Sequence, residues 1–299
     1  MSTLPALRSR IKSLGDLFEV VGAMRSLAAV RMQQATAALV GAREYAQVIG
    51  SGLAAASVIA RDGAMPIGRR ETAPSGPRGV MVFCAEHGFV GAFNEILLKN
   101  ARRRLTENDQ LLVIGRRGIS LAKERGAQVH WSLPMTSYRE GVAVTARRIA
   151  GELYKRFETG DLTRLETVHA RFETGGRWEI ERQTLLPLEL DRFEISSQNV
   201  PPLHNLGIER LLEKLIEEYF FAELAHITLE SLAAENAARL AAMSAAHDNI
   251  GRKLEDLTRA EHQLRQDAVT TELLDVVTGS EALLAGEDEK LDASGREKS

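Results

Sequence analysis

Both ends of this chain carry a helical repeat of apolar side chains. Residues 206–284 contain no proline, and apolar or small residues recur there at alternating steps of three and four, at Leu229, Ala233, Leu240, Met243, Ile250, Leu254, Leu257, Leu264 and Ala268. This spacing places them on one stripe of an α-helix. At 1.5 Å of rise per residue, the helix would be roughly 100 Å long. It therefore needs a partner helix and, beyond that, a second protein.

The N-terminal segment provides the partner helix. Between Pro5 and Ala60 there is again no proline, and the same rhythm runs through Leu7, Ile11, Leu14, Phe18, Val21, Ala28, Met32, Ala35, Leu39, Ala42, Ala46, Ile49 and Leu53. A sustained period near 3.5 predicts a left-handed coiled coil, because supercoiling keeps such a seam on one side. Long alanine-rich repeats of this kind usually form interaction rods that carry no chemistry.

The middle of the chain has a different pattern. Short apolar runs at 79–85, 110–115 and 127–133 alternate with amphipathic segments, which predicts a parallel sheet with crossover helices. Residues 165–173 and 178–186 alternate apolar and polar residues around the Thr-Gly-Gly at 174–176, which predicts an antiparallel hairpin at one sheet edge. The expected fold class is α/β: a long antiparallel coiled coil of the two terminal helices with an inserted Rossmann-like domain of about five strands.

The expected divisions follow from these patterns. They are an N-terminal helix at 1–60, a linker at 61–77, the α/β domain at 78–195, a linker at 196–206, a C-terminal helix at 207–285 and a polar, disordered tail at 286–299.

Composition narrows the class of protein. Hydrophobic residues make up 44%, charged residues 26% and aromatic residues 5% of the 299 residues, which is ordinary for a soluble protein. The net charge of −3 does not favour nucleic acid or anionic lipid as a partner. The single cysteine, Cys84, excludes an internal disulfide and fits a reducing compartment. No apolar run reaches the length of a membrane span, and the start has no secretory signal.

Candidate chemistry is sparse. The turns GRRG at 115–118 and HGFVGAFN at 87–94 each follow a strand, but neither matches a dinucleotide or phosphate-loop motif, so tight packing turns are favoured. Glu86 and His87 form the one acid–base pair near a sheet end, and no nucleophile accompanies them. The histidines are scattered, so we expect no metal site, no cofactor and no catalytic residue in this chain.

Polar residues interrupt both seams. Arg25 breaks the first, and Asn236 and Glu261 break the second. They either set the register of a coiled coil or meet polar groups of a protein that surrounds the rod. A dense polar patch follows near the end of the last helix, at Arg265, Gln266, Thr270, Thr271 and Glu272. An exposed coiled-coil terminus has the same appearance, so spacing leaves both alternatives open.

Two segments resemble a known family. RIKSLGDLFEVVGAMRSLAAVRMQQA at 10–35 resembles the start of F-type ATP synthase gamma subunits, and ESLAAENAARLAAMSAAHDN with RQDAVTTELLDVVTG resembles their C-terminal signature. The resemblance implies a central rotor shaft that couples ion-driven rotation of a c-ring to conformational cycling of beta-subunit sites. It implies alpha, beta and epsilon subunits and the c-ring as partners. The location implied is peripheral, at the cytoplasmic face of the bacterial inner membrane.

The resemblance also implies roles for particular residues. Residues implied to contact the alpha and beta subunits are Met24, Arg25, Glu235, Arg239, Arg265, Gln266, Thr270 and Glu272. Val276 and Val277 are implied to lie in a hydrophobic bearing. In this reading the chain is a non-catalytic subunit of an ion-translocating complex, and ATP is made or hydrolysed elsewhere.

The sequence departs from the family in places. Gly15 and Gly22 stand where relatives usually carry basic residues, and a glycine inside a helix costs about 1 kcal/mol relative to alanine. Such departures indicate a divergent branch, for example an alternative ATPase. Two competing readings are a coiled-coil scaffold or adaptor with an α/β domain, and a nucleotide-binding enzyme with a coiled-coil arm. The scaffold predicts self-association, and the enzyme requires a phosphate loop that does not stand out.

Overall fold

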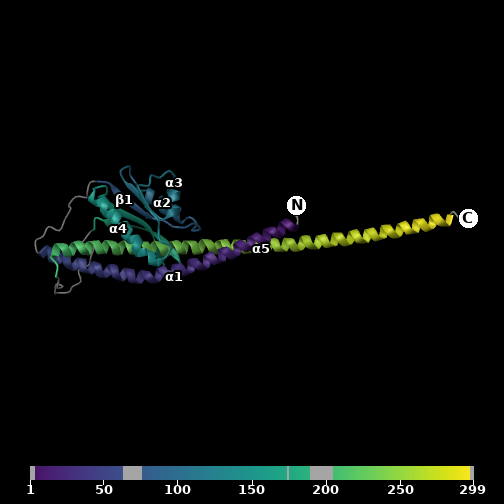
Figure 1. Ribbon diagram of the computed structural model, residues 1–299, viewed down its shortest axis with the longest axis horizontal. Coiled ribbons are helices and arrows are strands. Elements are labelled where there is room, and N and C mark those ends of the chain that lie inside the picture. The colour runs from purple at the N-terminus through teal and green to yellow at the C-terminus, as the bar shows by residue number, and fades with distance from the viewer. Residues whose placement is uncertain (1–3, 63–75, 174, 189–204, 297–299) are drawn as a thin grey trace. The chain divides into compact units, whose positions relative to one another are not determined.

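The computed structural model describes residues 4–62, 76–173, 175–188 and 205–296 (Figure 1). The chain divides into two compact units: Met24–Ser244, and Met1–Ala23 with Ala245–Ser299. We call the first the sheet unit and the second the terminal unit. Helices α1 (Leu4–Asp62) and α5 (Ile208–Arg296) contribute residues to both. Most of both predicted linkers lies outside the described residues.

A five-stranded sheet forms the centre of the sheet unit. Strands β1 (Arg78–Phe83), β2 (Gln110–Ile114), β3 (Trp131–Leu133), β4 (Arg164–Glu173) and β5 (Arg177–Leu186) lie in the order β3-β2-β1-β4-β5. The first four are parallel, and β5 is antiparallel to β4 at the edge. Gly175 and Gly176, both at positive φ, form the turn of this hairpin. The predicted mixed α/β sheet is confirmed.

Crossover helices connect the parallel strands. They are α2 (Phe93–Arg102), α3 (Arg116–Glu124) and α4 (Val142–Glu158), and a short 3-10 helix η1 (Arg139–Gly141) precedes α4. Helices α2 and α3 pack on one face of the sheet, in a cluster that includes Val80, Val82 and Val113. Helix α4 packs on the other face with α1 and α5, in a cluster that includes Met81 and Phe83. Alternate side chains of β1 therefore belong to two hydrophobic clusters, one on each face of the sheet.

The third strand is shorter than predicted. The apolar run at 127–133 indicated a strand throughout, but β3 covers Trp131–Leu133 alone. Gly126, at φ 67°, ends the preceding turn. At His130, the backbone N–H donates to the carbonyl of Leu111, and the Nδ1 atom accepts from the N–H of Leu111 at 3.1 Å. This side-chain bond takes the place of a ladder bond, so regular pairing starts one residue later.

Helices α1 and α5 are antiparallel within each unit. In the terminal unit, Arg8 pairs with Glu261, and Phe18 stacks on His247 with ring centroids 3.8 Å apart. In the sheet unit, the hydroxyl of Tyr45 donates to Glu218, while Ala56 and Ala60 pack against Leu212. Every residue of the predicted α1 seam is buried or half-buried. The predicted coiled-coil pairing is therefore confirmed as far as Glu261, and His247 is a packing residue of the seam. Beyond that point, Leu264 and Ala268, which the repeat predicted on the α5 seam, are exposed.

One stretch of α5 is buried on all sides. Every residue from 227 to 239 is buried, because in the sheet unit α5 lies between α1 and the sheet (Figure 1). Small residues such as Ala233, Ala234 and Ala237 permit this close packing. The stretch also contains the polar residues Thr228, Glu230, Ser231, Glu235, Asn236 and Arg239. Buried polar groups need hydrogen-bond partners, so the contacts of these residues identify candidate functional sites.

The last helix ends later than predicted. We expected helix to residue 285 and then a disordered polar tail, but α5 runs to Arg296. The added segment, GEDEKLDASGR, contains no proline, and its Glu, Lys, Leu, Ala and Arg residues favour helix, whereas its two glycines do not. The low apolar content of residues 286–299 indicates that they do not form a packed core. It does not exclude a helical backbone.

Candidate functional site

A buried ion pair on α5 holds the turn that follows β1. The Nη2 atom of Arg239 lies 2.5 Å from Oε1 of Glu235, one helical turn away, and the two residues are 6% and 3% exposed. The other carboxylate oxygen of Glu235 accepts from the backbone N–H of Glu86 at 3.2 Å. Arg239 also donates to the carbonyl oxygens of His87 and Gly88, each at 3.3 Å. The pair therefore binds backbone groups of the turn.

The turn and the two long helices enclose a hollow of about 350 Å³. Two of the predicted residues, Met24 and Arg239, line it, and so does Asn236. Asn236 donates to the carbonyl of Leu232 and accepts from Arg239. The remaining lining residues are Leu27, Ala28, Arg31, His87, Gly88 and Phe89. Residues more than two hundred positions apart in the sequence thus meet at one place, where α1, the turn and α5 converge.

The turn itself presents an aromatic side chain. Phe89 has φ 62°, a left-handed conformation that is unusual for a residue other than glycine, and its side chain is exposed. The two bonds from Arg239 to the carbonyls just before it hold the backbone in this conformation. The arrangement is typical of a strained, functional turn whose support comes from the surrounding structure.

The acid–base candidate Glu86–His87 has structural roles. Oε2 of the buried Glu86 accepts from the N–H groups of Arg116 and Met135, at 3.0 and 2.8 Å, and Oε1 lies 2.9 Å from Nε of Arg116. His87 pairs with the hydroxyl of Ser137. The carboxylate of Glu86 thus links the segments that follow β1, β2 and β3, and most of its hydrogen-bond acceptor sites are occupied.

The glycines of the GRRG turn permit close packing. A Cβ on Gly115 would lie 2.3 Å from the carbonyl oxygen of Cys84, and one on Gly118 would lie 2.1 Å from the Cβ of Cys84. Helix α3 can therefore approach β1 only because these positions lack side chains. The predicted interpretation as a strand-to-helix turn is supported by this packing.

Burial controls the electrostatics of this region. Desolvation raises the pKa of Glu235, and the ion pair with Arg239 and the bond from the Glu86 N–H only partly oppose it. Desolvation also raises the pKa of the Cys84 thiol, and the charge of Glu235 adds to the effect. A buried thiol of this kind is unreactive, so Cys84 is a packing residue.

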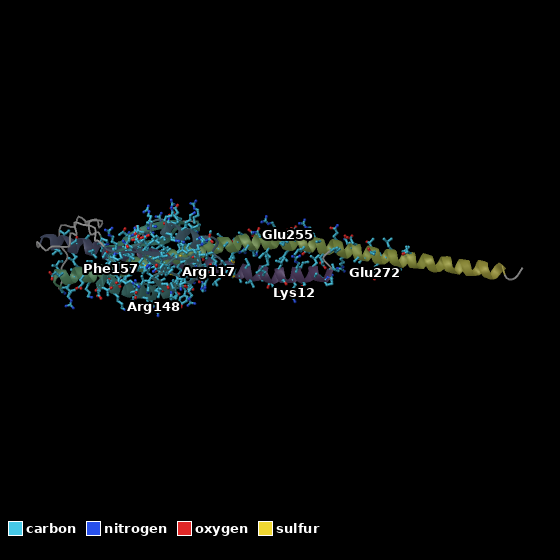
Figure 2. All side chains as sticks on the ribbon, turned by 90° about the horizontal axis from the view of Figure 1, so that it is seen from above. Lys12, Arg117, Arg148, Phe157, Glu255 and Glu272 are labelled. Carbon is cyan, nitrogen blue, oxygen red and sulfur yellow. The ribbon has the colours of Figure 1, made fainter. Side chains whose placement is uncertain are left out.

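Four other predicted contact residues lie in the terminal unit. Arg265, Gln266, Thr270 and Glu272 are all exposed on α5. Thr270 donates its hydroxyl proton to the carbonyl of Gln266, a bond internal to the helix. In Figure 2, Glu272 lies on a part of α5 that has no described element of this chain beside it. These side chains are therefore available to another molecule. Arg25, which belongs to the sheet unit, is half-buried on α1.

Apolar side chains accompany this polar patch. The two predicted bearing residues, Val276 and Val277, are 65% and 52% exposed. Further exposed apolar residues on the same stretch of α5 are Val269, Leu273 and Leu274. Such a contiguous exposed apolar surface typically marks an interaction site. Helix α1 also exposes apolar residues away from its seam, at Leu17, Val20, Leu27, Val30, Val40 and Val48.

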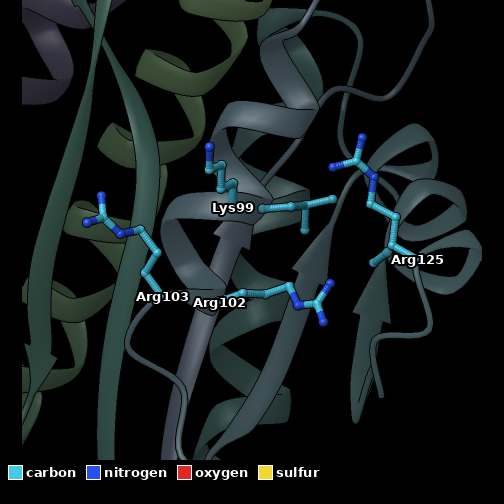
Figure 3. Close-up of a pocket in the computed structure, with 6 residues that line it drawn as sticks. Lys99, Arg102, Arg103 and Arg125 are labelled. Atoms are coloured by element: carbon cyan, nitrogen blue, oxygen red, sulfur yellow. The ribbon is translucent and has the colours of Figure 1, made fainter.

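A basic hollow of about 390 Å³ lies between α2 and α3. Lys99, Arg102, Arg103 and Arg125 line it, and their charged ends point in different directions (Figure 3). Arg125 already pairs with Glu95 at 3.0 Å. The arrangement therefore does not single out one position for a bound anion.

Two polar clusters in the sheet unit have no motif in the sequence. Arg78, at the start of β1, pairs with Asp109 and Glu166. His169 of β4 lies 3.1 Å from Glu230 of α5, with Glu181 of β5 close by. The predicted hairpin could have indicated that Glu181 and His169 lie on neighbouring strands, but no spacing in the sequence relates either residue to Glu230.

Comparisons with known proteins agree with these observations. The model of the ATP synthase family matches residues 3–283. The ATP synthase gamma chain of Nostoc punctiforme is 28% identical over 322 aligned residues, which cover 95% of this chain and 100% of that one. The gamma chain of Paracoccus denitrificans is 28% identical, with the same coverage of both chains. Among the described residues, no helix is apolar enough over a sufficient length to cross a membrane.

Solved structures share the fold. A chain of the Euglena gracilis mitochondrial ATP synthase, in a structure of OSCP, F1 and c-ring, superposes with a TM-score of 0.63 at 13% identity, covering 95% of each chain. A chain of the Tetrahymena thermophila central stalk and c-ring gives 0.56 at 20% identity, covering 76% of this chain and 99% of that one. Because the family model and the gamma-chain relatives align with nearly the whole length, this chain belongs to the ATP synthase gamma-chain family.

Proposed function

We propose that this chain is the central rotor shaft of an F-type ATP synthase. The observation that carries the proposal is the exposed, partly apolar surface of α1 and α5, on a chain that matches the gamma-chain family over nearly its whole length. An isolated rod with this surface would be poorly soluble, whereas a shaft inside a hexamer of alpha and beta subunits would be covered. Family membership makes the chain a subunit of the synthase complex, and we propose a non-catalytic one.

The shaft would couple rotation to catalysis through differential contacts. An asymmetric pair of helices presents a different surface at each rotor angle. Each angle then stabilises one beta-subunit conformation more than the others, and rotation shifts the populations in sequence. No chemistry is required of the shaft itself, which agrees with the structural roles found for Glu86 and the GRRG turn.

Different residues would contribute in different ways. Arg265, Gln266, Thr270 and Glu272 are exposed, and we propose that they contact a beta-subunit loop directly. Val276 and Val277 would lie in a hydrophobic bearing, where their exposed apolar surface becomes buried. The half-buried Met24 and Arg25 would face the moving region of a beta subunit.

Glu235 and Arg239 are also among the predicted contact residues, but we propose a different role for them. Both are buried in this chain, and their polar atoms bind the turn after β1. We propose that they act as positioning residues, which keep the turn and its exposed Phe89 fixed against the shaft. A neighbouring subunit would then contact the turn and the rim of the hollow, not the ion pair itself.

The remaining partners follow from the same assignment. The structural neighbours are described as a rotor and as a central stalk with a c-ring. We propose that the α/β domain of this chain contacts the c-ring and the epsilon subunit, and that the complex places the chain at the cytoplasmic face of a bacterial inner membrane.

The test is assembly with the alpha and beta subunits encoded beside this chain. We expect co-purification through a tag on beta at one copy per three beta subunits. The double variant Arg265→Ala, Thr270→Ala should alter ATP turnover without loss of assembly, because it removes direct contacts from an exposed helix. A matched control is Lys123→Ala on α3, which is also exposed and should leave turnover unchanged.

Two outcomes would contradict the proposal. A chain that stays apart from the hexamer, or that self-associates instead, would favour a scaffold. Turnover that is equally insensitive to both variants would exclude the proposed contact at 265–270.

A further inference from the structure

Three potential metal ligands, one each from β4, β5 and α5, lie close together in the sheet unit. His169 on β4, Glu181 on β5 and Glu230 on α5 each offer one ligand atom, and these atoms all lie within 4.8 Å of one another. His169 and Glu181 are direct cross-strand partners in the β4–β5 ladder. Nε2 of His169 lies 3.1 Å from Oε2 of Glu230. All three residues belong to the sheet unit.

Two of the three residues are buried and Glu181 is half-buried, and the cluster is incompletely satisfied. His169 and Glu230 are 1% and 3% exposed. Nδ1 of His169 has no hydrogen-bond partner among the described residues. A second imidazole, that of His226, places its Nε2 atom 3.7 Å from the other oxygen of Glu230, and this nitrogen also has no hydrogen-bond partner there. Buried polar atoms are rarely left unpaired, so the Nδ1 atom of His169 and the Nε2 atom of His226 show that the polar groups around Glu230 are not fully satisfied.

The nearby cations do not replace such a ligand. Arg43 approaches Glu230 only to 4.0 Å, and its side chain is largely exposed. Arg171 lies 3.1 Å from Glu181 and also pairs with Glu173 and Glu179, so its charge is shared among three carboxylates. A buried carboxylate requires a compensating charge close to it. A bound divalent cation would supply one at the point where the ligand atoms converge.

From these contacts we infer that His169, Glu181 and Glu230 form a site for a divalent transition-metal ion, whose fourth position would be open to water. Imidazole and carboxylate together suit Zn²⁺, whereas Mg²⁺ and Ca²⁺ prefer all-oxygen sites. In a tetrahedral Zn²⁺ site, neighbouring ligand atoms lie about 3.4 Å apart. The 3.1 Å between Nε2 of His169 and Oε2 of Glu230 is close to that spacing, and the three ligand atoms all lie within 4.8 Å of one another.

The site would have a mechanical consequence. It would join the β4–β5 hairpin to the buried stretch of α5, by bonds that do not depend on apolar packing. Metal binding to the folded chain stabilises it by mass action. The inference departs from the sequence expectation of no metal site, because the ligands lie in three separate segments and show no motif spacing.

The experiment is metal titration of the full-length chain, purified without a histidine tag and freed of metal with a chelator. Zn²⁺ binding is measured by calorimetry, and Co²⁺ serves as a spectroscopic probe. We expect one Zn²⁺ per chain and Co²⁺ absorption bands of tetrahedral intensity. Glu230→Gln and Glu181→Gln should each weaken Zn²⁺ binding at least tenfold, since each removes a charged ligand.

The control is Glu179→Gln, on the same strand and exposed, which should change Zn²⁺ affinity less than twofold. Glu181 is only partly buried, so its variant should fold even if Glu230→Gln does not, and circular dichroism verifies this. If wild type binds no stoichiometric Zn²⁺, or binds it as tightly as folded Glu181→Gln does, the cluster is an ion pair and the inference is wrong.

Discussion

Arg239 is bonded at once to Glu235, one turn away on α5, and to two backbone carbonyls of the turn after β1. These bonds hold the turn through its backbone. The side chains of the turn are therefore available to contact another molecule. Phe89, exposed on that turn, and Met24, which lines the adjoining hollow, are the side chains placed to do so.

Arg239→Ala should be strongly destabilising. The change leaves the carboxylate of Glu235 buried without its cation and removes two bonds to the turn. Loss of one partner of a buried pair costs about 3–5 kcal/mol. Urea unfolding followed by circular dichroism measures the loss. Arg259→Ala, which breaks an exposed pair with Asp256, is the control and should have little effect. Equal losses in both variants would contradict the assigned role of Arg239.

The stability contributed by Glu235 should decrease as pH rises. Burial raises its pKa above the ordinary value of 4.5. The folded chain therefore holds this proton more tightly than the unfolded chain does. The contribution is complete below the unfolded pKa and is lost as pH rises through the folded pKa. The free energy of unfolding of wild type minus that of Glu235→Gln, measured from pH 4 upward, should fall. A difference that grows with pH would show the opposite shift.

Asp109 should show the opposite dependence. Burial alone would raise its pKa, but the hydrogen bonds from Arg78 and Thr106 outweigh it and hold the pKa below the ordinary value of 3.8. A lowered pKa stabilises the folded chain above the unfolded pKa, and the effect is lost as pH falls through the folded pKa. Asp109→Asn should therefore be less stable than wild type near pH 7, and the two should converge in acid. A gap that persists at pH 2 would assign the effect to packing.

Two glycine-to-alanine changes should act in opposite directions. At Gly15 an added Cβ would have no atom within 4 Å, so Gly15→Ala should stabilise α1 by about 1 kcal/mol. At Gly118 the same atom would meet the Cβ of Cys84 at 2.1 Å, and overpacking of this kind costs about 1–3 kcal/mol. Thermal melts of the two variants test both signs. Destabilisation by Gly15→Ala would mean that the helix needs glycine there.

The apolar surface at the end of α5 should govern assembly. Val276→Asp with Val277→Asp adds charge to side chains that are exposed in the isolated chain. The variant should therefore fold normally and be more soluble than wild type, yet it should bind the alpha–beta hexamer less tightly. Val144→Asp, on an exposed position of α4, is the control and should leave hexamer binding unchanged. Unchanged binding by the double variant would exclude a bearing at these residues.

Local pattern was sufficient for much of the architecture. The three-four repeat predicted both long helices and their pairing, because one apolar stripe on each must be covered. Short apolar runs and one alternating pair of segments predicted the parallel strands and the antiparallel β5. The errors occurred at element ends: the hydrogen bond of His130 shortened β3, and α5, which meets no proline, continues to Arg296.

The sequence by itself determined the elements, the family resemblance and the residues carried over from it, including Arg265 and Thr270. Only the tertiary structure showed that Glu235 and Arg239 are buried and bound to the turn, and that His169, Glu181 and Glu230 converge. The physical reason is that periodicity reports which face of one element is apolar. Burial on every side, as at residues 227–239, depends on what packs against the remaining faces, and those partners come from distant parts of the chain.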